Sequence, residues 1–433
     1  MRELTRQTIV WAITGLAVAA AAGQTAAAAP PAARAEKGEA AQAPGEWPQW
    51  RGPNRDNVSA ETGLLKRWPD DGPPLAWKAG GIGEGYSSVS VAGGRIFTMG
   101  DGPDSSYVHA LELDGGKKIW SAKVGRTGGN YEGTRSTPTV DGDRVYALGQ
   151  WGDLVCLDAA TGREHWRKNL EKDFGGRMMS GWGYSESVLL DGERVVCTPG
   201  GGKGTLLALN KATGEPVWRT EDFTDDAAYS SIVPATIGGV RQHVQLTGAS
   251  VVGVAPDTGD VLWRAARQGE TAVIPTPVVH DDHVFVTSGY NVGCNLFRVT
   301  RGPGGKFTAG QVYANKDMQN HHGGVVLVGG HVYGTSGNQL VCMNLMTGKV
   351  AWKDRSVGKG AVAYADGHLY VRSEGGEGTV ALVEATPKGY AEKSRFDQPD
   401  RSDKQSWPHP VIVGGKLYLR DQDVLLCYDV KAK

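Results

Sequence analysis

Short runs of alternating hydrophobic and polar residues recur along most of the chain, and they occur in pairs that are joined by a tight turn. STPTV-DGD-RVYAL (136–148) and HPVIV-GG-KLYLR (409–420) are two examples. A period of two indicates a half-buried strand, and an Asp-Gly or Gly-Gly pair between two such runs indicates a hairpin. Turns, most of them with an Asp-Gly or Gly-Gly pair, lie at 92–94, 141–142, 191–192, 238–239, 281–282, 329–330, 366–367 and 414–415. The pattern therefore predicts eight β-hairpins.

A second pattern follows the hairpins, and CLDAATGREHW (156–166) is its clearest copy. Similar segments lie at 208–218, 253–263 and 342–352, with a looser one at 110–120. Each has a small residue, a polar turn ending at Gly, and Trp four residues later, which predicts a third and a fourth strand. The aromatic residues that close these units are Trp77, Trp120, Trp166, Trp218, Trp263 and Trp352, with Tyr313 and Phe396 as substitutes. Four antiparallel strands repeated every forty to fifty residues are typical of a β-propeller blade.

The two ends of the repeat region are out of phase with each other. Trp77 has no hairpin before it, and the last hairpin and its third strand, Val424–Asp429, have no closing aromatic after them. We predict that the strand around Trp77 pairs beside Leu425-Leu426-Cys427, which leaves no free sheet edge where the ring closes. The expected fold is thus an all-β, eight-bladed propeller over residues 77–433. The closing tryptophans are expected to dock one blade onto the next.

The pattern A-x-D-x-x-T-G-x-x-x-W resembles the tryptophan-docking motif of the PQQ-like β-propeller superfamily, over roughly Trp77 to Val430. That superfamily includes quinoprotein alcohol dehydrogenases and the outer-membrane assembly scaffold protein BamB. The segment WPQWRGPNRD (47–56) is similar to the N-terminal part of BamB-like exported proteins of planctomycete-type bacteria. Residues 46–76 are expected to form an extended strap along the outside of the blades.

The N-terminus has the order of a secretory signal peptide. Arg2 and Arg6 precede an apolar run from Ile9 to Ala22, and small residues follow. We predict a signal peptide at 1–29 and a disordered Ala/Pro linker at 30–45, with an uncleaved anchor as the alternative. The mature chain would then be in the periplasm or outer cell envelope and would not be an integral membrane protein. With 46 basic and 47 acidic residues there is no basic excess for nucleic acid.

The residues that open the innermost strand of each blade should line one mouth of the axial channel, where propellers commonly hold ligands. The candidate ligand-binding residues at this mouth are Tyr86, Arg135, Trp182, Tyr184, Glu186, Tyr229, His321, His322 and His409. The structural alternative is a tight channel filled by Ser, Tyr and water, in which the histidines satisfy backbone groups. Neighbouring residues on a strand point to opposite sides, so His321 and His322 are not expected to face inward together without a bulge. The functional alternative is that Glu186, His321, His322 and His409 converge on a metal or an acidic ligand, with Arg135 assisting. No metal site is assigned.

The resemblance implies different chemistry for an enzyme and for a scaffold. A PQQ-dependent dehydrogenase would need Ca²⁺ held by oxygen ligands and commonly has two adjacent cysteines, whereas the five cysteines here are separate. The leading hypothesis is a non-enzymatic binding or assembly scaffold with a protein partner in the cell envelope, without an assigned cofactor or catalytic residue. The alternatives are a PQQ- and Ca²⁺-dependent alcohol dehydrogenase-type oxidoreductase and a module that binds carbohydrate or another small ligand.

Overall fold

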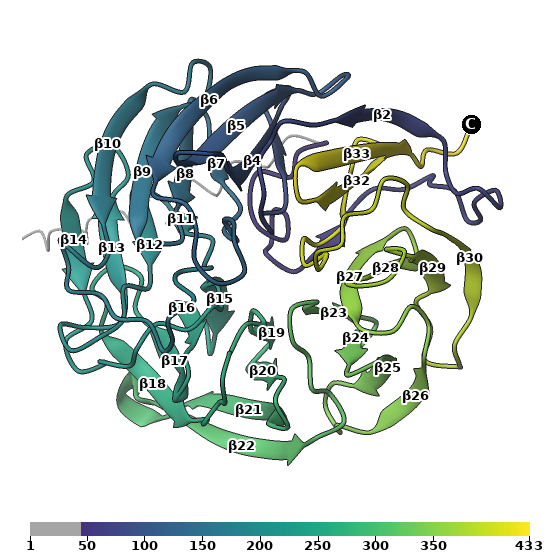
Figure 1. The fold of residues 1–433 in the computed structure, drawn as a ribbon. Coiled ribbons are helices and arrows are strands. Elements are labelled where there is room, and N and C mark those ends of the chain that lie inside the picture. The colour runs from purple at the N-terminus through teal and green to yellow at the C-terminus, as the bar shows by residue number, and fades with distance from the viewer. Residues whose placement is uncertain (1–44) are drawn as a thin grey trace, which may run out of the picture. The chain divides into compact units, whose positions relative to one another are not determined.

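The structure, a computed structural model, describes residues 45–433. Within this range eight β-sheets form a closed ring, which confirms the predicted eight-bladed propeller (Figure 1). Seven sheets have four strands each. The remaining sheet, blade 7, has the short strand β1 (Val58–Ser59) as a fifth strand, which pairs in parallel with the innermost strand of that blade. The predicted signal peptide and nearly all of the predicted linker lie outside the described residues. No helix in residues 45–433 is long and apolar enough to cross a bilayer.

In most blades the strands follow the chain from the centre of the ring to its rim. Blade 1 consists of β3 (Ser90–Ala92), β4 (Arg95–Asp101), β5 (Ser106–Glu112) and β6 (Lys118–Gly125). Blade 2 consists of β7 (Thr139–Asp141), β8 (Arg144–Leu148), β9 (Asp153–Asp158) and β10 (Glu164–Asn169). Blade 3 consists of β11 (Leu189–Asp191), β12 (Arg194–Cys197), β13 (Leu207–Asn210) and β14 (Pro216–Arg219). Blade 4 consists of β15 (Val233–Ile237), β16 (Val240–Leu246), β17 (Ser250–Val254) and β18 (Val261–Ala266).

The second half of the ring repeats this order. Blade 5 consists of β19 (Val278–His280), β20 (His283–Ser288), β21 (Gly293–Arg301) and β22 (Phe307–Asn315). Blade 6 consists of β23 (Val325–Val328), β24 (His331–Ser336), β25 (Gln339–Asn344) and β26 (Val350–Asp354). Blade 7 consists of β27 (Gly360–Ala365), β28 (His368–Ser373), β29 (Val380–Glu384) and β30 (Glu392–Phe396). A single 3₁₀ turn, η1 (Pro303–Gly305), lengthens the outer hairpin of blade 5 and is the only helical element of the described chain.

Blade 8 joins the two ends of the repeat region. It consists of β31 (Val411–Val413), β32 (Lys416–Asp421), β33 (Val424–Asp429) and, on the outside, β2 (Leu75–Ala79). Trp77 on β2 lies opposite Cys427 on β33 in an antiparallel register, as predicted. Figure 1 shows β2, near the start of the described chain, beside the C-terminal strand β33. The ring is thus closed by backbone hydrogen bonds between strands from its two ends.

The recurring tryptophans connect neighbouring blades through one repeated contact. The indole N–H of Trp120 donates to the carbonyl of Ala159 in blade 2 (3.1 Å), and Trp166 donates in the same way to Lys211 in blade 3 (3.0 Å). The turn glycine of the next blade lies against the indole. A Cβ placed on Gly162, whose φ is +74°, would be 2.6 Å from the Trp120 ring. Gly in the motif therefore accommodates the preceding blade's Trp.

The segment that precedes β2 differs from its expected position. Its first part, Trp47–Ser59, does not lie along the outside of the blades but crosses the axis of the ring. Arg51 donates to the carbonyl of Val325 in blade 6, and Arg55 donates to the carbonyls of Ser187 (2.5 Å) and Val188 (3.1 Å) in blade 3. The side chains of Arg51, Arg55 and Asn57 are all buried. Innermost strands have an unpaired edge, and buried carbonyls there require donors, which this segment supplies.

Candidate functional site

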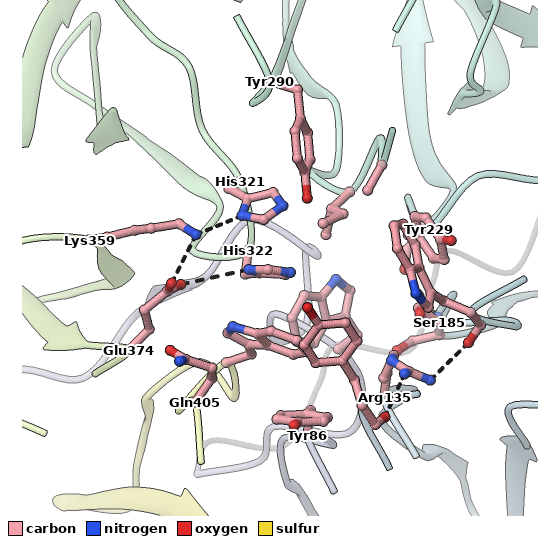
Figure 2. A pocket seen from close by; sticks show the side chains of 18 residues that line it. Tyr86, Arg135, Ser185, Tyr229, Tyr290, His321, His322, Lys359, Glu374 and Gln405 are labelled. Carbon is pink, nitrogen blue, oxygen red and sulfur yellow. Dashed lines mark hydrogen bonds and ion pairs between the residues drawn. The ribbon is translucent and has the colours of Figure 1, made fainter. Parts of the chain in front are cut away.

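A cavity of about 320 Å³ lies at the end of the axial channel where the chain enters the innermost strands (Figure 2). All eight blades contribute to its wall. The segment Trp47–Ser59 that crosses the axis, called the axial segment below, contributes Trp50. The lining residues are Trp50, Tyr86, Tyr131, Arg135, Trp182, Ser185, Ser187, Tyr229, Ser231, Ala272, Ile274, Tyr290, His321, His322, Lys359, Glu374, Gln405 and Trp407. A second cavity of about 310 Å³ is lined by Arg51, Asn54, Arg55 and Asp56 of the same segment. The axial segment therefore lies between the two cavities.

Aromatic rings form most of the wall of the first cavity. The Trp407 ring lies 4.2 Å from the ring of Tyr86 and 5.5 Å from that of Tyr131, measured between centroids. On another side it stacks on His322 at 4.0 Å with an interplanar angle of 20°. Trp182 lies between Tyr131 and Tyr229, at 6.4 Å from each. Such rings offer flat apolar faces to a ligand together with a few polar edges.

The polar part of the wall is a cluster of His321, His322, Lys359 and Glu374, all labelled in Figure 2. The ammonium of Lys359 contacts Glu374 Oε1 (2.8 Å) and donates to His321 Nδ1 (2.7 Å). His322 Nδ1 faces the other oxygen of Glu374 at 3.6 Å, a contact that is electrostatic and too long for a hydrogen bond. The two imidazole centroids are 3.7 Å apart.

The protonation states in this cluster follow from burial and neighbouring charge. Burial, with His322 and Lys359 as further causes, lowers the pKa of His321 to about 3, and burial also lowers the pKa of His322. Burial alone would raise the pKa of Glu374, but the facing His322 and Lys359 outweigh it and lower that pKa. At neutral pH Glu374 is therefore a carboxylate, and the imidazoles of His321 and His322 are neutral.

Arg135 contributes positive charge to the cavity, and three of its five N–H groups donate to backbone carbonyls. Its guanidinium donates to the carbonyls of Asn130 (3.2 Å), Tyr131 (2.7 Å) and Trp182 (3.1 Å). Burial lowers its pKa from the usual value of an arginine, although the group remains protonated at neutral pH. Arg135 thus connects the loops of blades 2 and 3 and holds Tyr131 and Trp182 in place.

Six of the nine predicted ligand-binding residues line the cavity, namely Tyr86, Arg135, Trp182, Tyr229, His321 and His322. His321 and His322 both do so because residues 316–324 form no strand, so the expected alternation of sides does not apply. Tyr184 and Glu186 point away from the cavity, whereas Ser185 and Ser187 between and after them line it. Including Tyr184 and Glu186 in the predicted mouth was wrong, because this extended segment alternates its side chains between the axis and the blade.

The three predicted residues that are not in the wall have structural partners. Tyr184 donates to the carbonyl of Pro199 (2.9 Å) inside a hydrophobic cluster. Glu186 accepts from the Thr198 amide (2.7 Å) and hydroxyl (3.0 Å), and burial raises its pKa to about 8. His409 packs against the wall residue Trp50, with ring centroids 4.5 Å apart. Its Nε2 donates to the carbonyl of His322 (2.9 Å), and burial lowers its pKa to about 3.

The prediction missed several wall residues, and two of them carry charge. Lys359 immediately precedes β27 and Glu374 immediately follows β28, and Gly360 pairs with Ser373 in that hairpin. Lys359 and Glu374 are therefore the next facing pair beyond the last paired residues. The register set by the turn at Asp366-Gly367 was the available signal, because counting outward from it places both residues at the mouth.

In comparisons with known proteins, the chain is similar both to BamB proteins and to a quinohemoprotein alcohol dehydrogenase. A family model described as outer membrane protein assembly factor BamB matches residues 104–354. Outer membrane protein assembly factor BamB of Kangiella koreensis is 25% identical over 214 residues, which are 48% of this chain and 49% of that protein. Quinohemoprotein alcohol dehydrogenase ADH IIB of Pseudomonas putida is 29% identical over 211 residues, 44% of this chain and 29% of that enzyme.

Among solved structures, the quinohemoprotein alcohol dehydrogenase of Comamonas testosteroni superposes with a TM-score of 0.61 at 13% identity. The match covers 90% of this chain and 81% of that enzyme, and it shows a shared fold alone. The chain spans about half the length of the first of these curated relatives and less of the second.

Proposed function

The chain belongs to the family described as outer membrane protein assembly factor BamB, and on that premise we propose that it is a non-enzymatic binding scaffold that assists protein assembly in the cell envelope. Membership also confirms the resemblance to PQQ-like propellers. The observation that carries the proposal is the family match over residues 104–354, which extends from blade 1 to blade 6. The predicted signal peptide and the relatives' role as outer membrane protein assembly factors support an exported protein with a protein partner at the outer membrane.

Complementation tests this scaffold function. The full chain is expressed in a bacterium that lacks its own BamB, and the amount of folded outer-membrane β-barrel proteins is measured. We expect partial restoration, together with processing of the N-terminus within residues 1–45. A variant with Trp166→Ala, which weakens the ring, serves as the control for a non-specific effect of expression. A folded, exported chain that leaves barrel protein levels unchanged would contradict the proposal.

The dehydrogenase alternative is not supported by the residues of the cavity. Ca²⁺ prefers six to eight oxygen ligands, but the wall contains one carboxylate, Glu374, which is already paired with Lys359. Across residues 45–433 no three His, Cys, Asp or Glu side chains converge in a metal-binding geometry. The near-parallel rings of Trp407 and His322 stack directly at 4.0 Å, so a planar quinone does not fit between them. These features support the scaffold over a dehydrogenase that uses PQQ with Ca²⁺.

A second function, binding of a small ligand, is favoured by the cavity itself. A plain structural channel needs neither a wall of aromatic rings nor a charged pair at its mouth. A cavity of about 320 Å³ has the size and apolar lining of small-molecule sites, with a few polar groups for orientation. The scaffold and ligand functions are compatible, because the cavity is confined to the axis and leaves the outer strands free for a protein partner.

A further inference from the structure

We propose that the axial cavity binds a neutral saccharide, whose hydroxyl groups are recognised by His321 and His322 and whose C–H face packs on the surrounding aromatic rings. This inference rests on the ligand-binding function above and adds the class of the ligand. Three features of the wall carry it, namely its charge, the hydrogen-bonding roles of the two histidines and the arrangement of its rings.

The charged side chains of the wall all have partners within the protein. Lys359 is paired with Glu374, and three of the five N–H groups of Arg135 donate to backbone carbonyls. A phosphate or carboxylate ligand beside Lys359 would meet the carboxylate of Glu374 as a like charge, and an ammonium ligand would meet Lys359 and Arg135 as like charges. A neutral ligand avoids both costs.

The neighbours of the two histidines give them opposite hydrogen-bonding roles. The ammonium of Lys359 can only donate, so His321 Nδ1 accepts, and the neutral ring carries its proton on Nε2. The carboxylate of Glu374 can only accept, which favours the proton of His322 on Nδ1 and leaves its Nε2 as an acceptor. His321 Nε2 is buried and has no hydrogen-bond partner among the described residues. Figure 2 shows these two nitrogens on the sides of the rings that face away from Lys359 and Glu374.

A donor and an acceptor on two rings whose centroids are 3.7 Å apart match two adjacent hydroxyl groups. One sugar oxygen accepts from His321 Nε2–H, and the neighbouring hydroxyl donates to His322 Nε2. Ser185 Oγ and Trp407 Nε1 are further buried polar atoms of the wall that have no partner in residues 45–433. Polyhydroxylated ligands use many such donors and acceptors at once, whereas an apolar ligand would leave them unpaired.

The arrangement of the rings favours a puckered ligand over a flat one. Around the wall the ring planes are tilted, by 32° between Tyr86 and Trp407, 46° between Tyr131 and Trp407, and 40° between Trp182 and Tyr229. A nucleobase would be bound best between two parallel faces, and the single near-parallel pair in the wall is already in contact. Tilted faces instead fit the several C–H surfaces of a sugar chair, which is apolar on its faces and polar at its rim.

Titration of the purified mature chain with cellobiose, maltose and N,N′-diacetylchitobiose tests the inference, with adenosine and PQQ as comparison ligands. Tryptophan emission is the readout, because Trp50, Trp182 and Trp407 line the cavity. We expect a saturable change with at least one saccharide below about 10 mM, which is ten times a Kd of about 1 mM. His321→Phe and His322→Phe keep an aromatic ring but remove both nitrogens, and each should weaken binding at least about tenfold.

His331→Phe is the matched control, since His331 lies in the same blade at the β23–β24 turn, outside the cavity, and should not change the affinity. Thermal melting of each variant verifies that it is folded. Unchanged saccharide affinity in both cavity variants would overturn the inference. A response to adenosine or PQQ without one to any saccharide would overturn the ligand class and retain the binding function, and no response to any of the five probes would overturn both.

Discussion

The rim and the axis of this propeller are built from the same repeat, but residues at the rim are similar from blade to blade whereas residues at the axis differ. At the rim, one contact is copied around much of the ring, with Trp120, Trp166, Trp218 and Trp352 each donating to a carbonyl of the following blade. At the axial mouth, each blade contributes different side chains. Positions that repeat hold the ring together, and positions that differ between blades create one asymmetric cavity. The distinction separates stability from binding and can be tested at single residues.

The largest effect is expected at the rim, from Trp166→Ala. The Trp166 side chain is buried, donates to Lys211 and lies against Gly214, so its removal leaves a cavity between blades 2 and 3. We expect a loss of about 3–5 kcal/mol in the free energy of unfolding, measured with denaturant. Trp182→Ala at the mouth is the matched control and should cost far less stability while abolishing saccharide binding. Equal losses of stability from both changes would remove the distinction between rim and axis.

The next effect concerns Arg55, which belongs to the axial segment. Replacing Arg55 by Met keeps an apolar stem but leaves the buried carbonyls of Ser187 and Val188 without their donor. Unsatisfied buried acceptors and the lost charged hydrogen bonds should together lower the free energy of unfolding by about 2–3 kcal/mol. Arg177→Met, at an exposed arginine of blade 3, is the control. A variant at Arg55 as stable as the Arg177 control would show that the axial segment is dispensable.

A pH profile of stability sharpens the comparison between two neighbours, Ser185 and Glu186. Burial raises the pKa of Glu186 to about 8 in the folded protein, above its usual value near 4.5. Between these values the folded state binds more protons than the unfolded state, so stability falls as pH rises. The contribution should be about 2 kcal/mol between about pH 6 and pH 8. Glu186→Gln should flatten the thermal unfolding profile in this window, and an unchanged slope would exclude Glu186 as its source.

The smallest effect on stability is expected from Ser185→Ala. The Ser185 hydroxyl is buried, faces the cavity and has no partner among the described residues. Its removal should change the free energy of unfolding by less than about 0.5 kcal/mol. Saccharide affinity should fall severalfold in the same variant, measured by titration. A clear loss of stability without any change in affinity would assign Ser185 to the structure of the ring.

The rim could be predicted from the sequence because its chemistry is periodic. The turn glycine and the Trp four residues later recur, so the blade count and the Trp77–Cys427 closure could be deduced. An exception within the rim is also visible in the sequence. Trp263 donates to Gln242 of its own blade (2.6 Å), and Gly253 occupies the slot that Cys or Ala fills in other copies. A Cβ at Gly253 would be 2.2 Å from the Trp263 nitrogen.

The axis could be predicted only in part, because non-periodic contacts leave no repeat to follow. Six wall residues were found from their position at the start of the innermost strands. Lys359 and Glu374 were not found, although hairpin register places them together. The inward course of Trp47–Ser59 had no local signal, since a segment rich in Trp, Pro and Arg suits an exposed surface equally well. Its place is decided by carbonyls of several distant blades, a tertiary property.

His321 and His322 are proposed to recognise the ligand of the asymmetric axial cavity. Nitrogen NMR of the histidine side chains, recorded with and without the saccharide that binds, tests this role most directly. We expect a proton on Nε2 of His321 and on Nδ1 of His322 in the free protein, with saccharide-dependent shifts at these two residues and none at His331. Identical tautomers in both rings, or shifts that spare both while the sugar binds, would contradict it.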